Sequence, residues 1–153
     1  MSITYRKMGL ESLDLLVATR VEVLRAANLL GADTDMSRVE AESRRYYAEA
    51  LADGTHTACL AFDGDEFVGA GGVSYYRVMP TYHDPTGRKA YIMNMYVRPA
   101  YRRRGIATHM LDLLVADARA KGVGSIALEA TAAGRPLSEK YGFIPLEHEM
   151  ELP

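Results

Sequence analysis

The sequence predicts a domain of mixed α/β (α+β) class, in which helices flank a mixed, largely antiparallel sheet. Residues 57–62 and 67–78 have strand patterns and are joined by Asp63-Gly64-Asp65, a typical hairpin turn, so we expect two neighbouring antiparallel strands. Residues 90–130 contain a strand, a helix and a strand in that order. This order predicts a parallel pair of strands with a helical crossover.

Two amphipathic helices are expected in the first third of the chain. After a short strand at residues 3–6, apolar residues recur at helical spacing over residues 10–30, and again over residues 36–53. Each of these segments ends at a glycine, a residue that commonly terminates helices. Ser37 and Glu40 have the spacing of a capping box at the start of the second helix.

The remaining elements follow the same signals. Apolar and aromatic residues occupy both parities of 90–97, which predicts a strand covered on both faces and therefore inside the sheet. A third helix begins near Gly105. We then expect a strand at residues 125–130, a short helix at 136–141 and a last strand at 144–152.

Composition bounds the function. With 153 residues, 48% hydrophobic and 25% charged, the chain is expected to form one globular domain over residues 1–153. A net charge of −2 argues against generic nucleic-acid binding. The single cysteine, Cys59, excludes an intramolecular disulfide and a cysteine-based zinc site. No run resembles a signal peptide or a membrane span, so we expect a reducing, cytoplasmic location and no membrane partner.

A basic turn before the third helix carries the main chemical signal. Arg102, Arg103 and Arg104 precede Gly105, and Ala107 lies in the first helical turn. The first turn of a helix has unpaired N–H groups and the positive end of the dipole, which together bind phosphate. The alternative to a phosphate-binding role is that the three arginines form a solvated surface turn. Because the total charge is near neutral, a phosphate-bearing small ligand is favoured over nucleic acid.

Two motifs then resemble a known family. The pattern R-x-x-G-x-A at residues 102–107 follows a strand that ends Y-V-x-P at 96–99, and it resembles the acetyl-CoA signature of the GNAT N-acetyltransferases. The sequence L-S-E-K-Y-G-F at 137–143 is similar to that family's short helix ending in Gly-Phe. The order of the elements agrees over nearly the whole chain.

The resemblance implies a cofactor site for acetyl-CoA. The strand at 90–97 and the strand that follows it would splay apart and admit the cofactor. Backbone N–H groups from about residue 103 to 108 would hold the pyrophosphate. The backbone of the strand at 90–97 would pair with the pantetheine arm. An N–H near Met95 would stabilise the developing oxyanion, so that the amine attacks directly and no metal takes part. The implied cofactor-binding residues are Met95, Tyr96, Val97, Arg102, Arg103, Arg104, Gly105, Ile106, Ala107, Thr108 and Thr131.

Four residues are candidates for the catalytic chemistry. Ser138 stands where the family often has a tyrosine that protonates the thiolate, and Tyr141 lies one helical turn further on. Glu129, near the end of a strand, is a candidate general base, and Asn94 is a candidate for orienting water or substrate. Three of them have a structural alternative: core packing for Tyr141, an exposed edge charge or a partner of an arginine for Glu129, and a hydrogen-bonded structural amide for Asn94.

Tyr75 and His83 are candidate acceptor-binding residues, although core packing explains Tyr75 equally well. His83 lies in a Pro/Thr/Gly-rich loop, and such loops often line pockets. The four histidines show no metal-ligand spacing, so no metal site is expected. Acidic residues in the first third, such as Glu42, are candidates for attracting a cationic acceptor or for a solvated helix face.

Together these features predict an acetyl-CoA-dependent N-acetyltransferase that modifies a primary amine, most simply of a small molecule. A peptide or protein acceptor is the alternative within the same chemistry. A non-catalytic acyl-CoA-binding or sensor module is the alternative from another class, and Ser138 is the residue that supports it. Because only one strand is expected after residue 143, the sheet edge is expected to be open, which makes a homodimer plausible.

Overall fold

Five strands form one sheet in the computed structural model, which describes residues 2–153. Their spatial order is the same as their order in the chain. All neighbouring pairs are antiparallel except the last, which is parallel, and this confirms the predicted mixed sheet. The strands are β1 (Ile3–Met8), β2 (His56–Asp63), β3 (Glu66–Arg77), β4 (Arg88–Val97) and β5 (Ser125–Leu128).

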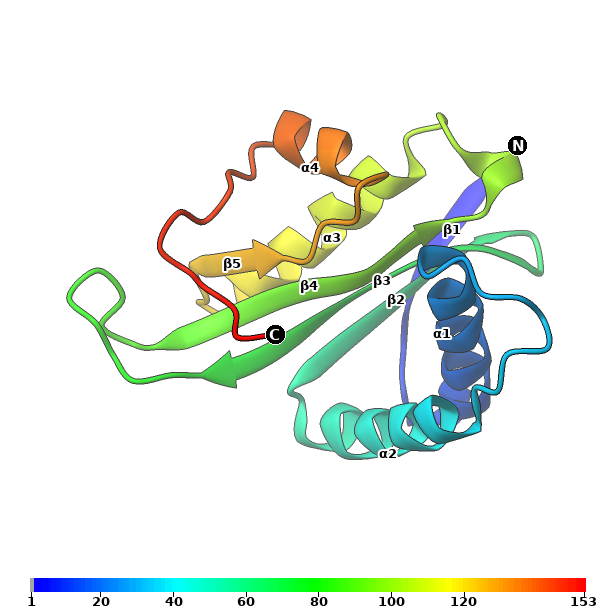
Figure 1. Ribbon diagram of the computed structural model, residues 1–153, viewed down its shortest axis with the longest axis horizontal. Helices are drawn as coiled ribbons and strands as arrows, with labels where there is room; N and C mark the ends of the chain where they lie inside the picture. Colours follow the sequence, from blue (N-terminus) through cyan, green and yellow to red (C-terminus); the bar gives the residue numbers. More distant parts are fainter. Residues whose placement is uncertain (1) are drawn as a thin grey trace.

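Four α-helices cover the two faces of this sheet, α1 and α2 on one face and α3 and α4 on the other (Figure 1). A short 3₁₀ turn precedes α1 (η1, Leu10–Ser12) and another precedes α3 (η2, Pro99–Tyr101). Within the described residues, none of the helices has the length and apolar character needed to cross a bilayer. The helices are α1 (Leu13–Ala27), α2 (Ser37–Asp53), α3 (Ile106–Ala120) and α4 (Arg135–Tyr141).

The alternation of side chains along β2 divides the core into two layers. Ala58, Leu60 and Phe62 pack with α1 and α2, whereas Cys59 and Ala61 pack with α3. Such near-continuous burial is expected for a central strand that helices cover on both faces.

The glycines of β3 allow close packing on both faces. A Cβ atom on Gly71 would lie 2.5 Å from Cγ of Met110 on α3, so only glycine lets this helix approach the strand. On the other face, a Cβ atom on Gly72 would lie 2.9 Å from Nε2 of His56. The Gly-rich run at 69–72 therefore serves the close packing of β3 against α3 and β2.

Two local predictions in the first third were wrong. The first helix ends at Ala27 rather than near residue 30, because Leu29 adopts a left-handed conformation with φ +54°. The capping box does not form, because Ser37 is already the first residue of α2 and its N–H donates to Oδ1 of Asp35 at 2.9 Å. The carboxylate of Asp35 thus bonds the backbone N–H two residues on, as in an Asx turn.

The strand expected at residues 144–152 is absent from the structure, and this prediction was wrong. The alternation that suggested it is present, but Ile144 is 82% exposed and Met150 is 99% exposed. Within residues 2–153 nothing covers this apolar face, and Pro145 removes one backbone donor from the segment. A strand pattern forms a strand only where a neighbouring edge or layer buries it.

Candidate functional site

A bulge interrupts the pairing of β4 with β3. Gly72 pairs with Met93 and Ala70 pairs with Tyr96, so two residues of β4, Asn94 and Met95, lie opposite Gly71 alone. Asn94 has φ +62°, a left-handed conformation that is uncommon outside glycine. The bulge therefore redirects the backbone and side chains of β4 at its midpoint.

Beyond the bulge, β4 runs past the end of β5. The parallel pairing extends from Lys89 opposite Ser125 to Ile92 opposite Leu128, followed by one bond from the N–H of Glu129 to the carbonyl of Ile92. Within residues 2–153, the stretch from Met93 to Val97 has no strand partner on this side (Figure 1). Such an edge presents backbone donors and acceptors that an extended ligand can pair with.

The start of α3 follows this edge in the chain and has the features of an anion site. Gly105, with φ +79°, is the N-cap residue, and no side chain caps the helix or places an acidic group in its first turn. The first helical bond runs from the N–H of His109 to the carbonyl of Gly105, which leaves the N–H groups of residues 106–108 as unpaired helix donors. Since a Cβ atom on Gly105 would meet nothing within 4 Å, the site is open to a ligand.

Three exposed arginines directly precede Gly105 and these amides. Nε of Arg102 donates to the carbonyl of Val97 at 3.2 Å, and the guanidinium of Arg104 lies 5.2 Å from the ring centroid of Tyr101. Arg103 adopts φ +63°. These residues add positive charge to the end of the helix dipole, which suits a diphosphate. The expected cofactor-binding residues at 95–97 and 102–108 thus lie on one strand edge and one helix N-terminus.

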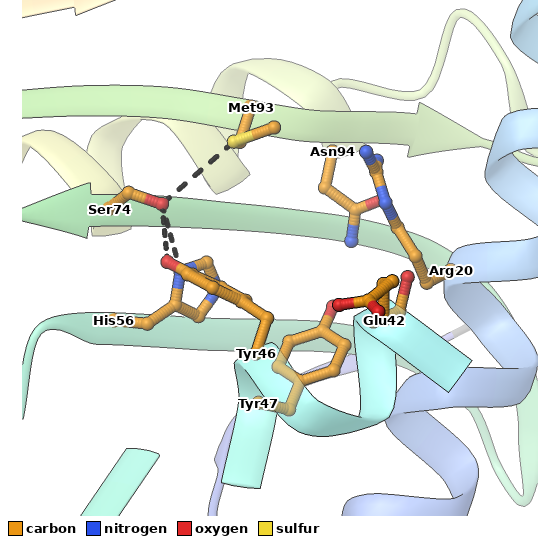
Figure 2. Close-up of a pocket in the computed structure, with 9 residues that line it drawn as sticks. Arg20, Glu42, Tyr46, Tyr47, His56, Ser74, Met93 and Asn94 are labelled. Atoms are coloured by element: carbon orange, nitrogen blue, oxygen red, sulfur yellow. Dashed lines mark hydrogen bonds between the residues drawn. The ribbon is translucent and has the colours of Figure 1, made fainter. Parts of the chain in front are cut away.

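A cavity of about 270 Å³ opens on the other face of the sheet, between β4 and the helices α1 and α2 (Figure 2). It reaches the bulge through Asn94, which is one of its walls. The residues that line it are Arg20, Glu42, Ser43, Tyr46, Tyr47, His56, Ser74, Met93 and Asn94.

A hydroxyl and imidazole cluster forms one wall of the cavity (Figure 2). The Tyr46 hydroxyl lies 2.7 Å from Oγ of Ser74 and 3.0 Å from Nδ1 of His56. His56 is only 7% exposed, and its Nε2 has no hydrogen-bond partner within the described residues. Burial, with a smaller contribution from the charge of Arg20, lowers the pKa of His56 to about 4. The imidazole is therefore neutral at neutral pH.

The opposite wall holds Arg20 against the bulge. Nη1 of Arg20 donates to Oδ1 of Asn94 at 2.9 Å. The neighbouring Tyr47 is 4% exposed, and burial raises the pKa of its hydroxyl to about 12, so the phenol stays protonated. Asn94 thus links the strand edge on one side to the cavity on the other.

Ser138 and Tyr141, two of the other candidate catalytic residues, lie on α4. The Ser138 hydroxyl donates to the carbonyl of Gly134 at 3.2 Å and borders a second cavity, of about 710 Å³, between α3, β5 and α4. The Tyr141 hydroxyl donates to Oδ1 of Asp112 on α3. Burial and, to a smaller extent, this hydrogen bond raise the pKa of the phenol.

Two further candidates lie in the segment between β5 and α4. Glu129 is exposed and directly follows β5. Oγ1 of Thr131 accepts a hydrogen bond from the N–H of Gly134 at 3.1 Å. Of the four candidate catalytic residues, Asn94 is therefore the one that lines the 270 Å³ cavity.

The two candidate acceptor-binding residues do not line this cavity. Tyr75 points to the α3 face, where its hydroxyl donates to Oδ2 of Asp117. His83 is exposed in the loop between β3 and β4, with its ring edge against Tyr82. Since side chains alternate along a strand, Ser74 rather than Tyr75 faces the cavity.

Sequence reasoning missed Arg20 and His56. One signal for Arg20 was available, because it lies four residues after Leu16 and three before Val23, both of which are buried. A charged residue on the apolar face of a helix is expected to contact a polar site. The sequence offered no comparable signal for His56.

An open strand edge beside a helix N-terminus with free amides suits an extended ligand that carries phosphate groups. The sequence matches the model of the Acetyltransferase (GNAT) family over residues 23–143. Because this match covers well over half of the chain, the protein belongs to the GNAT acetyltransferase family. This family is one of acyltransferases.

Solved structures show the same fold. A predicted acetyltransferase from Clostridium acetobutylicum, solved with acetyl-CoA, is 34% identical, covers 99% of this chain and 96% of its own, and superposes with a TM-score of 0.90. A GCN5-related N-acetyltransferase from Ralstonia eutropha JMP134 is 25% identical, with coverage of 99% and 98% and a TM-score of 0.84. An aminoglycoside acetyltransferase from an uncultured soil sample, at 23% identity, 100% and 99% coverage and a TM-score of 0.71, shares the fold. A search of curated proteins finds no match.

Proposed function

We propose that this protein transfers the acetyl group of acetyl-CoA to a primary amine of a small molecule by direct attack. The observation that carries the proposal is the position of the bulge in β4. Asn94 and Met95 belong to the open strand edge, and Asn94 is also a wall of the 270 Å³ cavity. A thioester held along this edge would therefore face an amine in the cavity.

Three sets of groups would hold the cofactor. The amides of Ile106, Ala107 and Thr108, together with the three arginines, would bind the diphosphate. The backbone of residues 95–97 would pair with the pantetheine arm, and the Thr131 hydroxyl would contact it. Acetyl-CoA supplies an acyl carbon activated by a thiolate leaving group. The N–H of Met95 would donate to the carbonyl oxygen, an effect worth roughly 3–4 kcal/mol per donor in other enzymes.

Proton transfer is the part of the reaction with the fewest candidate groups. The amine must lose a proton, and Glu129 or a water held by Asn94 would accept it. Ser138 or Tyr141 would protonate the departing thiolate, although both hydroxyls donate to other groups in the structure. Since a thiolate is a good leaving group, solvent can replace a dedicated acid.

The cavity supports a small acceptor. Its volume of about 270 Å³ lies below the roughly 300–1,000 Å³ of pockets that take drug-sized ligands. A peptide N-terminus is the alternative acceptor, with its side chains outside the cavity. A non-catalytic acyl-CoA-binding module is the alternative from another class, supported by the serine at position 138.

Release of free thiol tests the proposal. The protein is mixed with acetyl-CoA and a panel of small amines and short peptides, and binding of acetyl-CoA is measured in parallel by calorimetry. We expect thiol release above buffer with at least one small amine. Binding of acetyl-CoA with no thiol release over the whole panel would favour the non-catalytic module, and release with peptides alone would favour the other acceptor.

A homodimer formed through β5 is a second part of the proposal. Within residues 2–153, β5 has a strand partner only on its β4 side, and the apolar side chains of Ile126 and Leu128 border the 710 Å³ cavity along it. Such an edge can pair with a second copy of the chain. Light scattering at several concentrations tests this, and a monomer at all of them would contradict it. We also propose a reducing, cytoplasmic setting, consistent with the free, buried thiol of Cys59.

A further inference from the structure

Arg20 is a half-buried cation with little to neutralise it. Its one hydrogen bond within residues 2–153 runs to the neutral amide of Asn94, and no carboxylate of these residues forms an ion pair with it. A guanidinium has five N–H donors, so most of its donors are free to meet a ligand. Burying a charge without a partner is costly, which favours an anion at this place.

The other charged group in the cavity does not compensate Arg20. Glu42 is 59% exposed in its side chain and forms its ion pair with Arg45, at 3.6 Å, one turn along α2. The remaining polar side chains of the walls are neutral: the hydroxyls of Ser43, Tyr46, Tyr47 and Ser74, the amide of Asn94 and the neutral imidazole of His56. Arg20 is therefore the one cation among the residues that line the cavity, and within residues 2–153 its charge is not taken up by an ion pair with Glu42.

The place of this charge relative to the reacting centre matters as much as its sign. Arg20 contacts Asn94, the residue that belongs to both the cavity and the bulge (Figure 2). A ligand group bound by Arg20 therefore lies beside the strand edge proposed to hold the thioester. In a cavity of about 270 Å³, the anionic group and the amine of one molecule must be only a few bonds apart.

We propose that the acceptor is a small amine that carries an anionic group, a carboxylate or a phosphate, and that Arg20 binds this group and so directs the amine to the bulge. This inference rests on the proposed function and names its substrate class. Amino acids and amino-sugar phosphates fit the description. Polyamines and other polycations do not, because they would place like charge against Arg20.

Matched pairs of acceptors test the class of substrate. Each anionic amine is compared with the same molecule lacking its anion: an α-amino acid with its amide, and an amino-sugar phosphate with the free amino sugar. We expect kcat/KM to be at least about tenfold higher for the anionic member of one pair, the carboxylate and phosphate arms showing which anion is used. Equal or better turnover of the neutral members, or of spermidine, would overturn the proposal.

Substitution of Arg20 tests the residue. Arg20→Gln keeps a donor for Asn94 but removes the charge, and we expect it to raise KM for the anionic acceptor about tenfold or more and to abolish the preference over the neutral member. Arg20→Lys is expected to recover part of this preference. Arg44→Gln, the same change at an exposed arginine that pairs with Asp14, is the control and should leave the preference intact. An unchanged preference in Arg20→Gln would contradict the role of Arg20.

A binding measurement separates this inference from the proposed function. The same acceptor pairs are titrated by calorimetry into the wild-type protein and into Arg20→Gln, both loaded with coenzyme A. Selective binding of the anionic member by the wild type alone supports the anion site even if no thiol is released, in which case only the proposed transfer fails. Binding of neither member, or of both equally, contradicts the anion site whether or not turnover is seen.

Discussion

Nε and Nη2 of Arg98 lie 2.9 and 2.8 Å from the two carboxylate oxygens of Glu22. This two-point ion pair joins α1 to the residue that directly follows β4, between the open strand edge and the basic turn. The guanidinium holds the pKa of Glu22 below its usual range, despite the opposing effect of partial burial. The ion pair thus links α1, which contributes Arg20 to the cavity, to the end of β4.

Glu22→Gln should therefore destabilise the fold in a pH-dependent way. Because the folded-state pKa is lowered, the pair stabilises the protein fully above the unfolded pKa of roughly 4 and loses its effect as the pH falls through the folded value. We expect a loss of roughly 1 kcal/mol at pH 7 that shrinks toward pH 3, as measured by denaturant unfolding. Glu139→Gln, which breaks an exposed pair with Arg135, is the control and should have little effect. A deficit that stays constant with pH would contradict this role.

Gly105→Glu should weaken coenzyme A binding strongly. A Cβ atom at this position meets no neighbour within 4 Å, but the glutamate brings negative charge to the amides of α3 and strains a residue at φ +79°. Gly54 at the end of α2 is a matched control, with φ +81° and no neighbour within 4 Å. We expect similar losses of stability in Gly54→Glu and Gly105→Glu, but a rise in Kd of tenfold or more in Gly105→Glu alone. Equal affinities of the two variants for coenzyme A, measured by calorimetry, would contradict the proposed phosphate site at the start of α3.

Much of the fold was predictable because its signals are local. The hairpin at Gly64, the end of α2 at Gly54 and the start of α3 at Gly105 are set by glycines that adopt positive φ. Hydrophobic periodicity then places the elements between them, and the parallel pair follows from the order of strand, helix and strand. The proposed cofactor site uses backbone groups next to one of these glycines, Gly105, which is why it could be proposed from the sequence.

The cavity could not be predicted in the same way. Its walls come from α1, α2, β2, β3 and β4, and the contacts between Arg20 and Asn94 or between Tyr46 and His56 depend on how these elements pack. The left-handed Asn94 has no local sequence signature of the kind that glycine provides. A shift of one residue along β3 decides whether Ser74 or Tyr75 faces the cavity, and the pattern of the sequence left both open.

Tyr75→Phe and Tyr46→Phe should separate a structural tyrosine from one at the cavity. The Tyr75 hydroxyl is one of four donors to the buried carboxylate of Asp117, so its loss should cost about 1–2 kcal/mol of stability. We expect the KM for the acceptor to be unchanged in Tyr75→Phe and raised severalfold in Tyr46→Phe. Steady-state kinetics and thermal unfolding of both variants give the answer, and a raised acceptor KM in Tyr75→Phe would instead support a role for Tyr75 in binding.

Ser138→Tyr should preserve or increase turnover. Ser138 borders the 710 Å³ cavity beside β5, which gives a phenol ring room, and its own hydroxyl is engaged by the carbonyl of Gly134. If this position faces the departing thiolate, a tyrosine would supply the proton that solvent supplies in the wild type. Comparison of kcat with Ser138→Ala, expected to stay within about twofold of wild type, provides the control. A loss of kcat in Ser138→Tyr with unchanged acetyl-CoA affinity would indicate a different path for the proton.

His56 should make the stability of the protein depend on pH between about 4 and 6.5. Burial holds the pKa of His56 at about 4 in the folded state, against roughly 6.5 in an unfolded chain. Between these values the unfolded chain binds a proton that the folded protein does not, so stability falls as the pH is lowered through this window. A difference of this size corresponds to about 3 kcal/mol when the window is crossed completely.

Denaturant unfolding at half-unit steps from pH 4 to pH 7 measures this dependence. His56→Gln retains an amide that can bond the Tyr46 hydroxyl, so we expect it to be less stable than the wild type at pH 7 but to lose most of the slope below pH 6.5. His148→Gln, which removes an exposed histidine near the C-terminus, should reproduce the wild-type slope. A slope that persists in His56→Gln would mean that another group titrates on unfolding. It would contradict the lowered pKa of His56 and the neutral imidazole assigned to the cavity wall.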